Sequence, residues 1–224
     1  MRRSLGWPLA LALLVAGCGG TGQAGAAGGR HPAAARASAP GTPKPLPLAT
    51  AVVRGPDQAV GPPGPAATSG GDGPQPVRLR IPSIGVDSTL AALGLNGDGT
   101  IAVPPNYDHA GWYTKGPAPG ELGPAVILGH LDSYTGPAVF ARLSAVHPGD
   151  QVLVSRSDGT VAAFTVQRLD TFPVDAFPTQ EVYGATTEPA LRLITCGGRF
   201  DLGQRRYQAN VVVFATLSSI RPAG

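Results

Sequence analysis

Short runs of apolar and β-branched residues, separated by turn-forming residues, fill the chain from about residue 77 to residue 217. Runs of this length and composition are typical of β-strands rather than of helices. The predicted strands are residues 77–81, 86–93, 101–103, 125–128, 151–155, 161–166, 191–194 and 210–216. The Ser-Asp-Gly-Thr sequence at residues 157–160 joins two of them and predicts a β-hairpin.

These runs predict an all-β fold with about eight strands. Residues 137–143 are the best candidate for one of at most two short helices, because a proline is tolerated in a first helical turn. So many short strands must hide their edges, which favours a closed or nearly closed β-barrel. We therefore expect one barrel domain over residues 77–217, followed by a short C-terminal tail at residues 218–224.

Residues 19–76 have a different composition. The chain holds 32 Gly and 24 Pro, and these residues concentrate before the first predicted strand. Neither a period of 2 nor one of 3.6 occurs there, so the segment lacks the apolar surface needed to offset its ordering entropy. We expect a disordered tether, extended where proline is dense.

The first 18 residues have the pattern of an export signal. Two arginines precede an apolar run that is too short to span a membrane as a helix, and small residues then lead to Cys18. The sequence VAGC resembles a bacterial lipobox, which implies lipidation of Cys18. An ordinary signal peptide or a short uncleaved anchor is the alternative. In each case we expect the protein at the extracytoplasmic face of the cell membrane.

Charge and short motifs exclude several classes of function. The formal charge is +3, and most basic residues are scattered singly, which argues against a nucleic-acid surface. The glycine-rich patterns of nucleotide-binding loops do not occur, and no His, Cys and Asp spacing resembles a zinc site. We therefore expect no nucleic acid, no metal and no cofactor.

Two predicted strands end in reactive side chains. His130 follows the strand at residues 125–128, and Cys196 follows the strand at residues 191–194. A strand end gives a side chain the rigid support that nucleophilic catalysis requires. On spacing alone, a buried and inert cysteine is the favoured interpretation, because most lone cysteines are of this kind. Arg205 and Arg206 precede the last strand, where a cation would favour a thiolate and stabilise an oxyanion.

Five blocks along residues 77–217 carry a family resemblance: IPSIGVD, AGWY, GHLDSYTGPAVFARL, LRLITCGGRFD and YQANVVVFA. In this order and at these separations they resemble a sortase, specifically the class F type of actinobacteria. The resemblance implies a β-barrel cysteine transpeptidase that needs no cofactor. It acts on secreted proteins with a C-terminal LPXTG-like sorting signal and transfers them to a cell-wall amine.

The resemblance also implies roles for individual residues. Cys196 is the nucleophile that forms a thioacyl enzyme, and His130 exchanges protons with the leaving and the incoming amine. Related sequences often carry the catalytic arginine near the position of Gln208, so this chain departs from the pattern. Arg206 shares a strand face with Gln208 by the period of two and is our candidate, with Arg205 second. The sequence does not indicate which residues bind the substrate.

Two other classes remain as alternatives. An exported L,D-transpeptidase also uses Cys and His, but its signature places Ser-x-Gly before the nucleophile, whereas this chain has Thr-Cys-Gly-Gly. A non-catalytic surface lipoprotein with an inert Cys196 is the second alternative. Alkylation of Cys196 in the folded protein separates this one from an enzyme.

Overall fold

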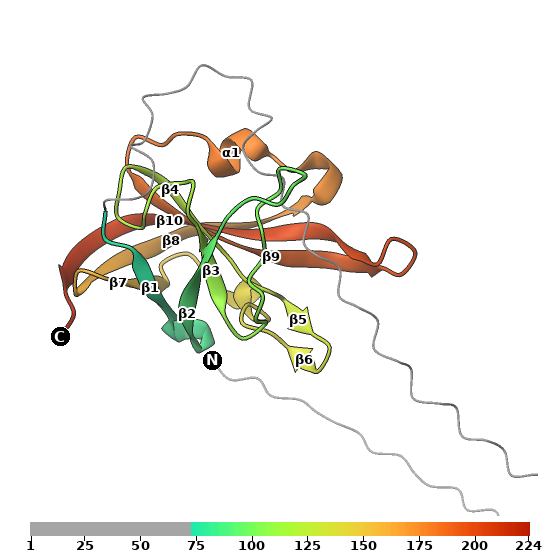
Figure 1. Ribbon diagram of the computed structural model, residues 1–224, viewed down its shortest axis with the longest axis horizontal. Coiled ribbons are helices and arrows are strands. Elements are labelled where there is room, and N and C mark those ends of the chain that lie inside the picture. Colours follow the sequence, from blue (N-terminus) through green and yellow to red (C-terminus); the bar gives the residue numbers. More distant parts are fainter. Residues whose placement is uncertain (1–72) are drawn as a thin grey trace, which may run out of the picture. The chain divides into compact units, whose positions relative to one another are not determined.

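Eight strands close into a barrel in the order β1-β2-β3-β4-β9-β10-β8-β7 (Figure 1). The computed structural model describes residues 73–224 of the protein. The barrel strands are β1 (Pro76–Ile81), β2 (Val86–Leu93), β3 (Ala110–Tyr113), β4 (Gly123–Leu128), β7 (Gln151–Arg156), β8 (Thr160–Pro173), β9 (Pro189–Asp201) and β10 (Arg206–Pro222). The predicted all-β barrel of about eight strands is thereby confirmed.

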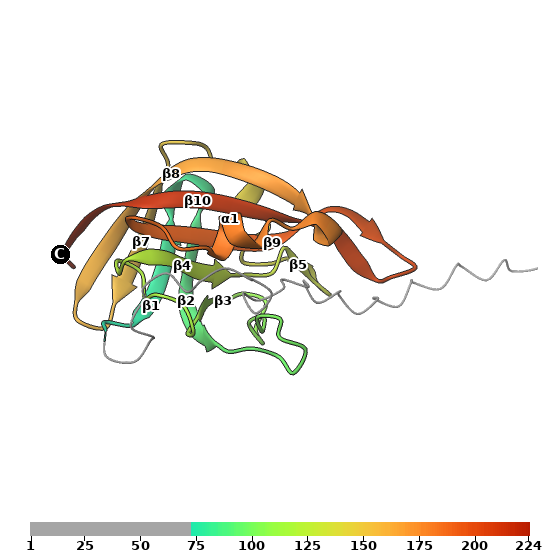
Figure 2. The same cartoon turned by 90° about the horizontal axis from the view of Figure 1, so that it is seen from above.

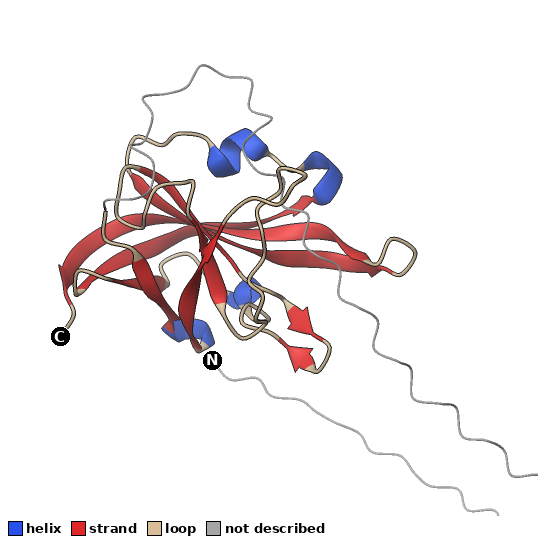
Figure 3. Ribbon diagram, in the orientation of Figure 1, coloured by secondary structure: helices blue, strands red, loops and turns tan. Residues whose placement is uncertain are grey.

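Little helix accompanies these strands (Figure 3). Two further strands, β5 (Asp132–Ser133) and β6 (Gly136–Pro137), form a separate small hairpin. The helical pieces are the 3-10 turns η2 (Pro82–Ile84), η3 (Leu143–Ala145) and η4 (Val174–Ala176), and the α-helix α1 (Thr179–Tyr183). The helix expected at residues 137–143 is thus replaced by the end of β6, a turn and the start of η3.

The barrel core explains why β4 and β9 have continuous apolar runs. Ile127 and Leu193 belong to the cluster that fills the barrel interior. Val126 and Ile194, their neighbours on the same strands, belong to a second cluster on the opposite face. Val182 of α1 completes that second cluster, and Figures 1 and 2 show α1 lying over these strands. Both strands are therefore buried on both faces, so they need apolar residues at every position.

Several boundaries differ from the expected ones. The predicted hairpin is present, with Ser155 of β7 paired to Val161 of β8. Strand β10 continues through Pro222, which pairs with Thr160, so part of the expected tail belongs to the barrel wall. The expected export signal at residues 1–18 and nearly all of the tether at residues 19–76 lie outside the described residues. Within residues 73–224, no helix is long and apolar enough to cross a membrane.

Leu193 tests the contribution of the interior cluster, because its side chain is fully buried. Replacement of Leu193 by Ala removes that contact surface and leaves a cavity, so we expect a loss of about 2–5 kcal/mol in unfolding free energy. The measurement is urea denaturation of the purified protein. The matched control is Leu122→Ala, since Leu122 is 58% exposed, and an equal loss in both variants would contradict this packing.

Candidate active site

Parallel pairing of β4 with β9 brings His130 and Cys196 to the same level of the sheet. Leu128 is the register partner of Ile194, and the amide of Gly129 donates to the Ile194 carbonyl at 3.1 Å. His130 follows Leu128 by two residues, and Cys196 follows Ile194 by two. Two residues separated by 66 positions in the sequence therefore reach one end of two adjacent strands. The predicted histidine and cysteine are brought together.

Cys196 lies in a largely closed environment. Cys196 is 5% exposed, and its sulfur forms no disulfide. Burial raises the pKa of the Cys196 thiol to about 12, and the negative charge of Asp132 adds to this shift. The sulfur is therefore a neutral thiol at physiological pH in this structure, and a base must remove its proton for it to act as a nucleophile.

Asp132 forms a short hydrogen bond with Tyr207 of the β9–β10 hairpin. The Tyr207 hydroxyl donates to Asp132 Oδ2 at 2.5 Å, while Asp132 Oδ1 is buried and has no hydrogen-bond partner. Burial, followed by this hydrogen bond and the charge of Asp132, raises the pKa of the Tyr207 hydroxyl. The contact ties the segment after His130 to β10. It also keeps a carboxylate close enough to influence the thiol.

The imidazole of His130 is held by the loop between β2 and β3. Its Nε2 atom lies 2.8 Å from the carbonyl oxygen of Pro104, and the Tyr107 ring lies 4.4 Å from the imidazole ring between centroids. A carbonyl oxygen only accepts hydrogen bonds, so Nε2 must carry a proton. The opposite nitrogen, Nδ1, is then the one that can exchange a proton without breaking this contact.

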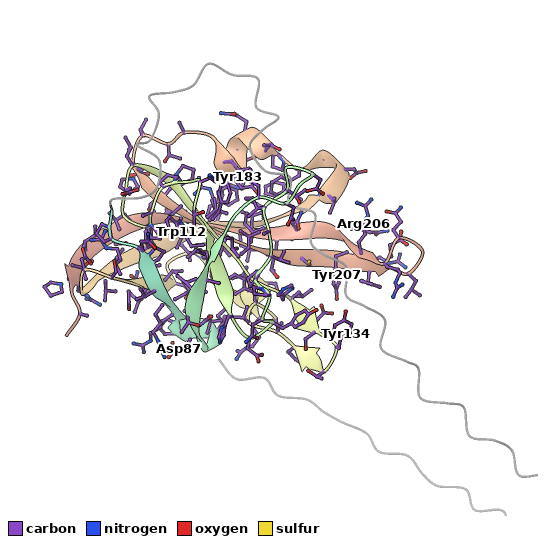
Figure 4. The ribbon with its side chains drawn as sticks, viewed as in Figure 1. Asp87, Trp112, Tyr134, Tyr183, Arg206 and Tyr207 are labelled. Carbon is purple, nitrogen blue, oxygen red and sulfur yellow. The ribbon has the colours of Figure 1, made fainter. Side chains whose placement is uncertain are left out.

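Arg206 lies further along the β9–β10 hairpin. It pairs with Asp201 beside the hairpin turn, and its Nε atom donates to Gln204 Oε1 at 2.6 Å. Cys196 is instead opposite Asn210, four residues further along β10. Figure 4 shows Arg206 and Tyr207 on this hairpin, with Tyr207 on the side of Tyr134. Alternation along the strand puts Arg206 on the same face as Asn210, but the structure does not place its guanidinium beside the sulfur.

Arg205, the second arginine considered, sits in the hairpin turn itself. It is exposed and has a φ of 53°, which lies in the left-handed region. A residue in this position projects from the turn rather than from the paired strands. The structure thus places Arg205 apart from both His130 and Cys196.

Asn210 is a site residue that the sequence analysis missed. It is the register partner of Cys196, is 1% exposed, and its buried Nδ2 atom has no hydrogen-bond partner. Side chains of directly paired residues project from the same face with their Cβ atoms about 5 Å apart. The available signal was one amide directly before the apolar run VVVFA at residues 211–215. Only the hairpin register shows that this amide faces the cysteine.

The two glycines after Cys196 have separate structural roles. A Cβ on Gly197 would lie 2.7 Å from Val211 Cγ2, so this glycine allows close packing between β9 and β10. Gly198 has a φ of 72° and begins a bulge in which two residues of β9 lie opposite Gln208. Gly197 therefore allows close packing, and Gly198 supplies the backbone conformation of the bulge.

A polar groove of about 480 Å³ adjoins this bulge. Gly198 and Ala209, which lie close to Cys196 and Asn210 along their strands, form one part of its lining. Arg199, Arg206, Asp175 and Asp201 bring charges of both signs to the same groove. Within residues 73–224, no three or more His, Cys, Asp and Glu side chains gather as a metal site.

Comparison with known proteins agrees with this geometry. The family model described as the sortase domain matches residues 79–218. The chain belongs to the sortase family. Sortases are transpeptidases that act on secreted proteins bearing a sorting signal and on cell-wall amines, and they generally work at the extracytoplasmic side of the membrane. No curated protein matches the chain in sequence.

Solved sortases share the fold of this chain. Sortase C of Streptococcus pneumoniae is similar with a TM-score of 0.50 and 20% identity, over 66% of this chain and 67% of that protein. Sortase C1 of Streptococcus agalactiae, solved in complex with MTSET, has a TM-score of 0.51 and 20% identity, over 64% of this chain and 69% of that one. At this identity the likeness establishes the barrel architecture of the family.

The raised pKa of Cys196 predicts how fast the thiol is alkylated. Only the thiolate reacts, so labelling by iodoacetamide is expected to rise about tenfold per pH unit from pH 7 to 10 without a plateau. Asp132→Asn removes a negative charge, lowers the thiol pKa and is expected to speed labelling at pH 8 by about twofold to fivefold.

Mass spectrometry of the intact folded protein gives the labelling rate. The matched control is Asp175→Asn, because Asp175 is an exposed carboxylate that does not contribute to the shift of the thiol. A plateau near pH 8.5 would show an ordinary thiol instead. Protection of Cys196 at every pH until the protein unfolds would indicate an inert core cysteine.

Proposed function

We propose that this sortase is a cysteine transpeptidase in which Cys196 and His130 carry the chemistry. The observation that supports the proposal is their shared level on the paired strands β4 and β9. A thiol and an imidazole at the same end of two adjacent strands meet the basic requirement of nucleophilic catalysis, in which a base activates the nucleophile. The substrate is an LPXTG-like sorting signal, cleaved between threonine and glycine.

The proposed reaction has two balanced steps. The thiol proton passes to the imidazole as sulfur attacks the threonine carbonyl carbon, and the C–N bond then breaks as the imidazolium protonates the leaving amine. An incoming amine next attacks the thioacyl carbon. A C–N bond forms, the C–S bond breaks, and the amine proton returns through His130 to the sulfur. Water in place of the amine gives hydrolysis.

The apolar face of β4 and β9 that α1 covers is the proposed site for the sorting signal. Leu128 and Ile194 precede His130 and Cys196 on their strands and are buried in the cluster that Val182 of α1 covers, so the peptide must displace α1 to reach them. The leucine and proline of the signal are apolar, and this face lies next to His130 and Cys196 along the two strands. Arg168 donates to Glu181 at 2.5 Å and so fastens α1 to the sheet, which makes α1 the proposed cover of the bound peptide.

Two groups are candidates to stabilise the oxyanion of the tetrahedral intermediate. Arg206 remains our proposal for a catalytic cation, since it shares the face of Asn210 and, among residues 73–224, its long side chain hydrogen-bonds only to Gln204. The amide of Asn210 lies opposite Cys196 and holds an unpaired N–H donor. A positioned donor of this kind typically accounts for about a hundredfold or more in rate.

The class F assignment and the membrane anchor are further parts of this proposal. The GHLDS and LITCGG blocks support class F, and they contain His130 and Cys196. The N-terminal sequence up to Cys18 supports export followed by lipidation. Attachment there would hold the enzyme at the extracytoplasmic face, where secreted proteins and a peptidoglycan-precursor amine are its partners.

Cys196→Ala is expected to abolish cleavage of a fluorogenic LPXTG-type peptide, because no other described cysteine can form the thioester. Mass spectrometry of the wild-type protein should reveal a peptide fragment bound to Cys196 when several candidate signals are supplied in parallel. Ser157→Ala, on the β7–β8 turn, is the control variant; it is purified in the same way and is expected to keep wild-type activity. Turnover retained by the Cys196 variant would disprove the mechanism.

Separate replacement of the two oxyanion candidates tests their roles. If Arg206 stabilises the oxyanion, Arg206→Ala is expected to lower kcat by about a hundredfold. If the Asn210 amide is the donor, the same loss is expected from Asn210→Ala. Steady-state cleavage of the same peptide gives kcat and KM separately. Circular dichroism confirms folding of each variant. A loss confined to Arg205→Ala would transfer the role to Arg205.

A further inference from the structure

The polar groove beside the β9 bulge continues the face that carries the nucleophile. Arg206, Gln208 and Asn210 alternate along β10 and therefore project from one face of the sheet. Asn210 is the partner of Cys196, whereas Gln208 and Arg206 line the groove. The groove thus begins within two residues of the site and extends toward the hairpin turn.

The apolar face beneath α1 and the groove lie on opposite sides of Cys196 along β9. Ile194 precedes Cys196 and belongs to the apolar cluster, while Gly198 and Arg199 follow it and line the groove. If the sorting signal occupies the apolar side up to the scissile bond, its leaving amine departs on the side of the groove. Formation and breakdown of the thioester are the same reaction in opposite directions, so the incoming amine must approach where the leaving amine departs.

The charges in the groove indicate what the incoming molecule carries. Asp201 already accepts two backbone N–H groups, and Arg206 is hydrogen-bonded to Gln204. Arg199 and Asp175, by contrast, are exposed and form no hydrogen bond or ion pair with any described residue. Arg199 is therefore the open cation of the groove. Two carboxylates nearby disfavour a dianion such as a phosphate monoester, whereas a single carboxylate is tolerated.

We infer that the groove is the acceptor site and that it selects amines carrying a carboxylate, which Arg199 binds. This inference rests on the proposed transpeptidase function and specifies its second substrate. Arg199 lies three residues beyond Cys196, which corresponds to at most about 10 Å along β9, because the bulge at Gly198 shortens the strand. An acceptor with its amine and carboxylate about three residues apart can therefore reach the thioester and Arg199 at once.

The acceptor amine loses two protons when it forms the new amide bond. It arrives as an ammonium ion, and the open carboxylate of Asp175 favours its entry to the groove. His130 takes one proton from the ammonium ion and releases it to solvent, and the neutral amine then attacks the thioacyl carbon. The C–N bond forms, the C–S bond breaks, and the second amine proton passes through His130 to the sulfur, which restores the thiol. The carboxylate remains ionised throughout and contributes binding alone. Its recognition should therefore appear in the KM for the acceptor rather than in thioester formation.

Triglycine and triglycinamide are the probes, since they share the attacking amine and differ in the terminal carboxylate. The full chain is incubated with a cleavable sorting peptide and either acceptor, and mass spectrometry quantifies the ligated product. We expect the wild-type protein to show a KM for triglycine about fivefold to tenfold below that for triglycinamide. Arg199→Gln is expected to abolish this difference, and Arg199→Lys to retain part of it.

Arg221→Gln is the matched control. Arg221 is an exposed arginine, like Arg199, but it lies near the C-terminal end of β10. This variant is expected to keep the wild-type preference. Equal use of both acceptors by the wild-type protein, or a preference that persists in Arg199→Gln, would overturn the inference. Release of the peptide fragment by hydrolysis without any such preference would refute the acceptor site alone. Absence of both cleavage and covalent capture would refute the proposed function and this inference with it.

Discussion

Parallel pairing between β4 and β9 is the constraint on which the site depends. Each strand is buried on both faces, so neither can shift by one residue without moving apolar side chains out of two separate clusters. The register of Leu128 with Ile194 is therefore strongly specified. His130 and Cys196 follow these residues by two positions, so the same register fixes their places without a direct contact between them.

Much of the fold was predictable because its signals are local. Apolar runs marked seven of the eight barrel strands, and a Ser-Asp-Gly-Thr turn marked the β7–β8 hairpin. The run at residues 101–103 forms only an isolated bridge from Ile101 to Leu95, and β3 was not predicted. The same applies to His130 and Cys196, which end two such runs. Asn210 could not be identified as a neighbour of Cys196, since cross-strand register depends on the whole hairpin. The Gly198 bulge likewise shifts the pairing beyond it, so the sequence could not show how far Arg206 lies from the sulfur along the hairpin.

The described state of the site is closed. Cys196 is buried, its neighbour Asp132 disfavours the thiolate, and Pro104 holds the imidazole of His130. Each of these features suppresses reaction of the thiol with solvent or small electrophiles. A peptide that displaces the covering loop and enters beneath α1 would change all of them at once. Under the proposed mechanism, this arrangement would couple the reactivity of the thiol to substrate binding, and specificity would arise partly from the free energy of opening.

Strand β10 connects the site to the end of the chain. It begins beside the hairpin turn, passes Cys196 at Asn210 and remains paired with β8 as far as Pro222. Twelve residues of extended strand separate Asn210 from Pro222, a span of up to about 40 Å. The last described residues therefore lie far from Cys196 along the sheet. A fluorescent protein or a surface linker fused after Gly224 would leave both substrates free access, which makes this end the natural point for immobilising the enzyme.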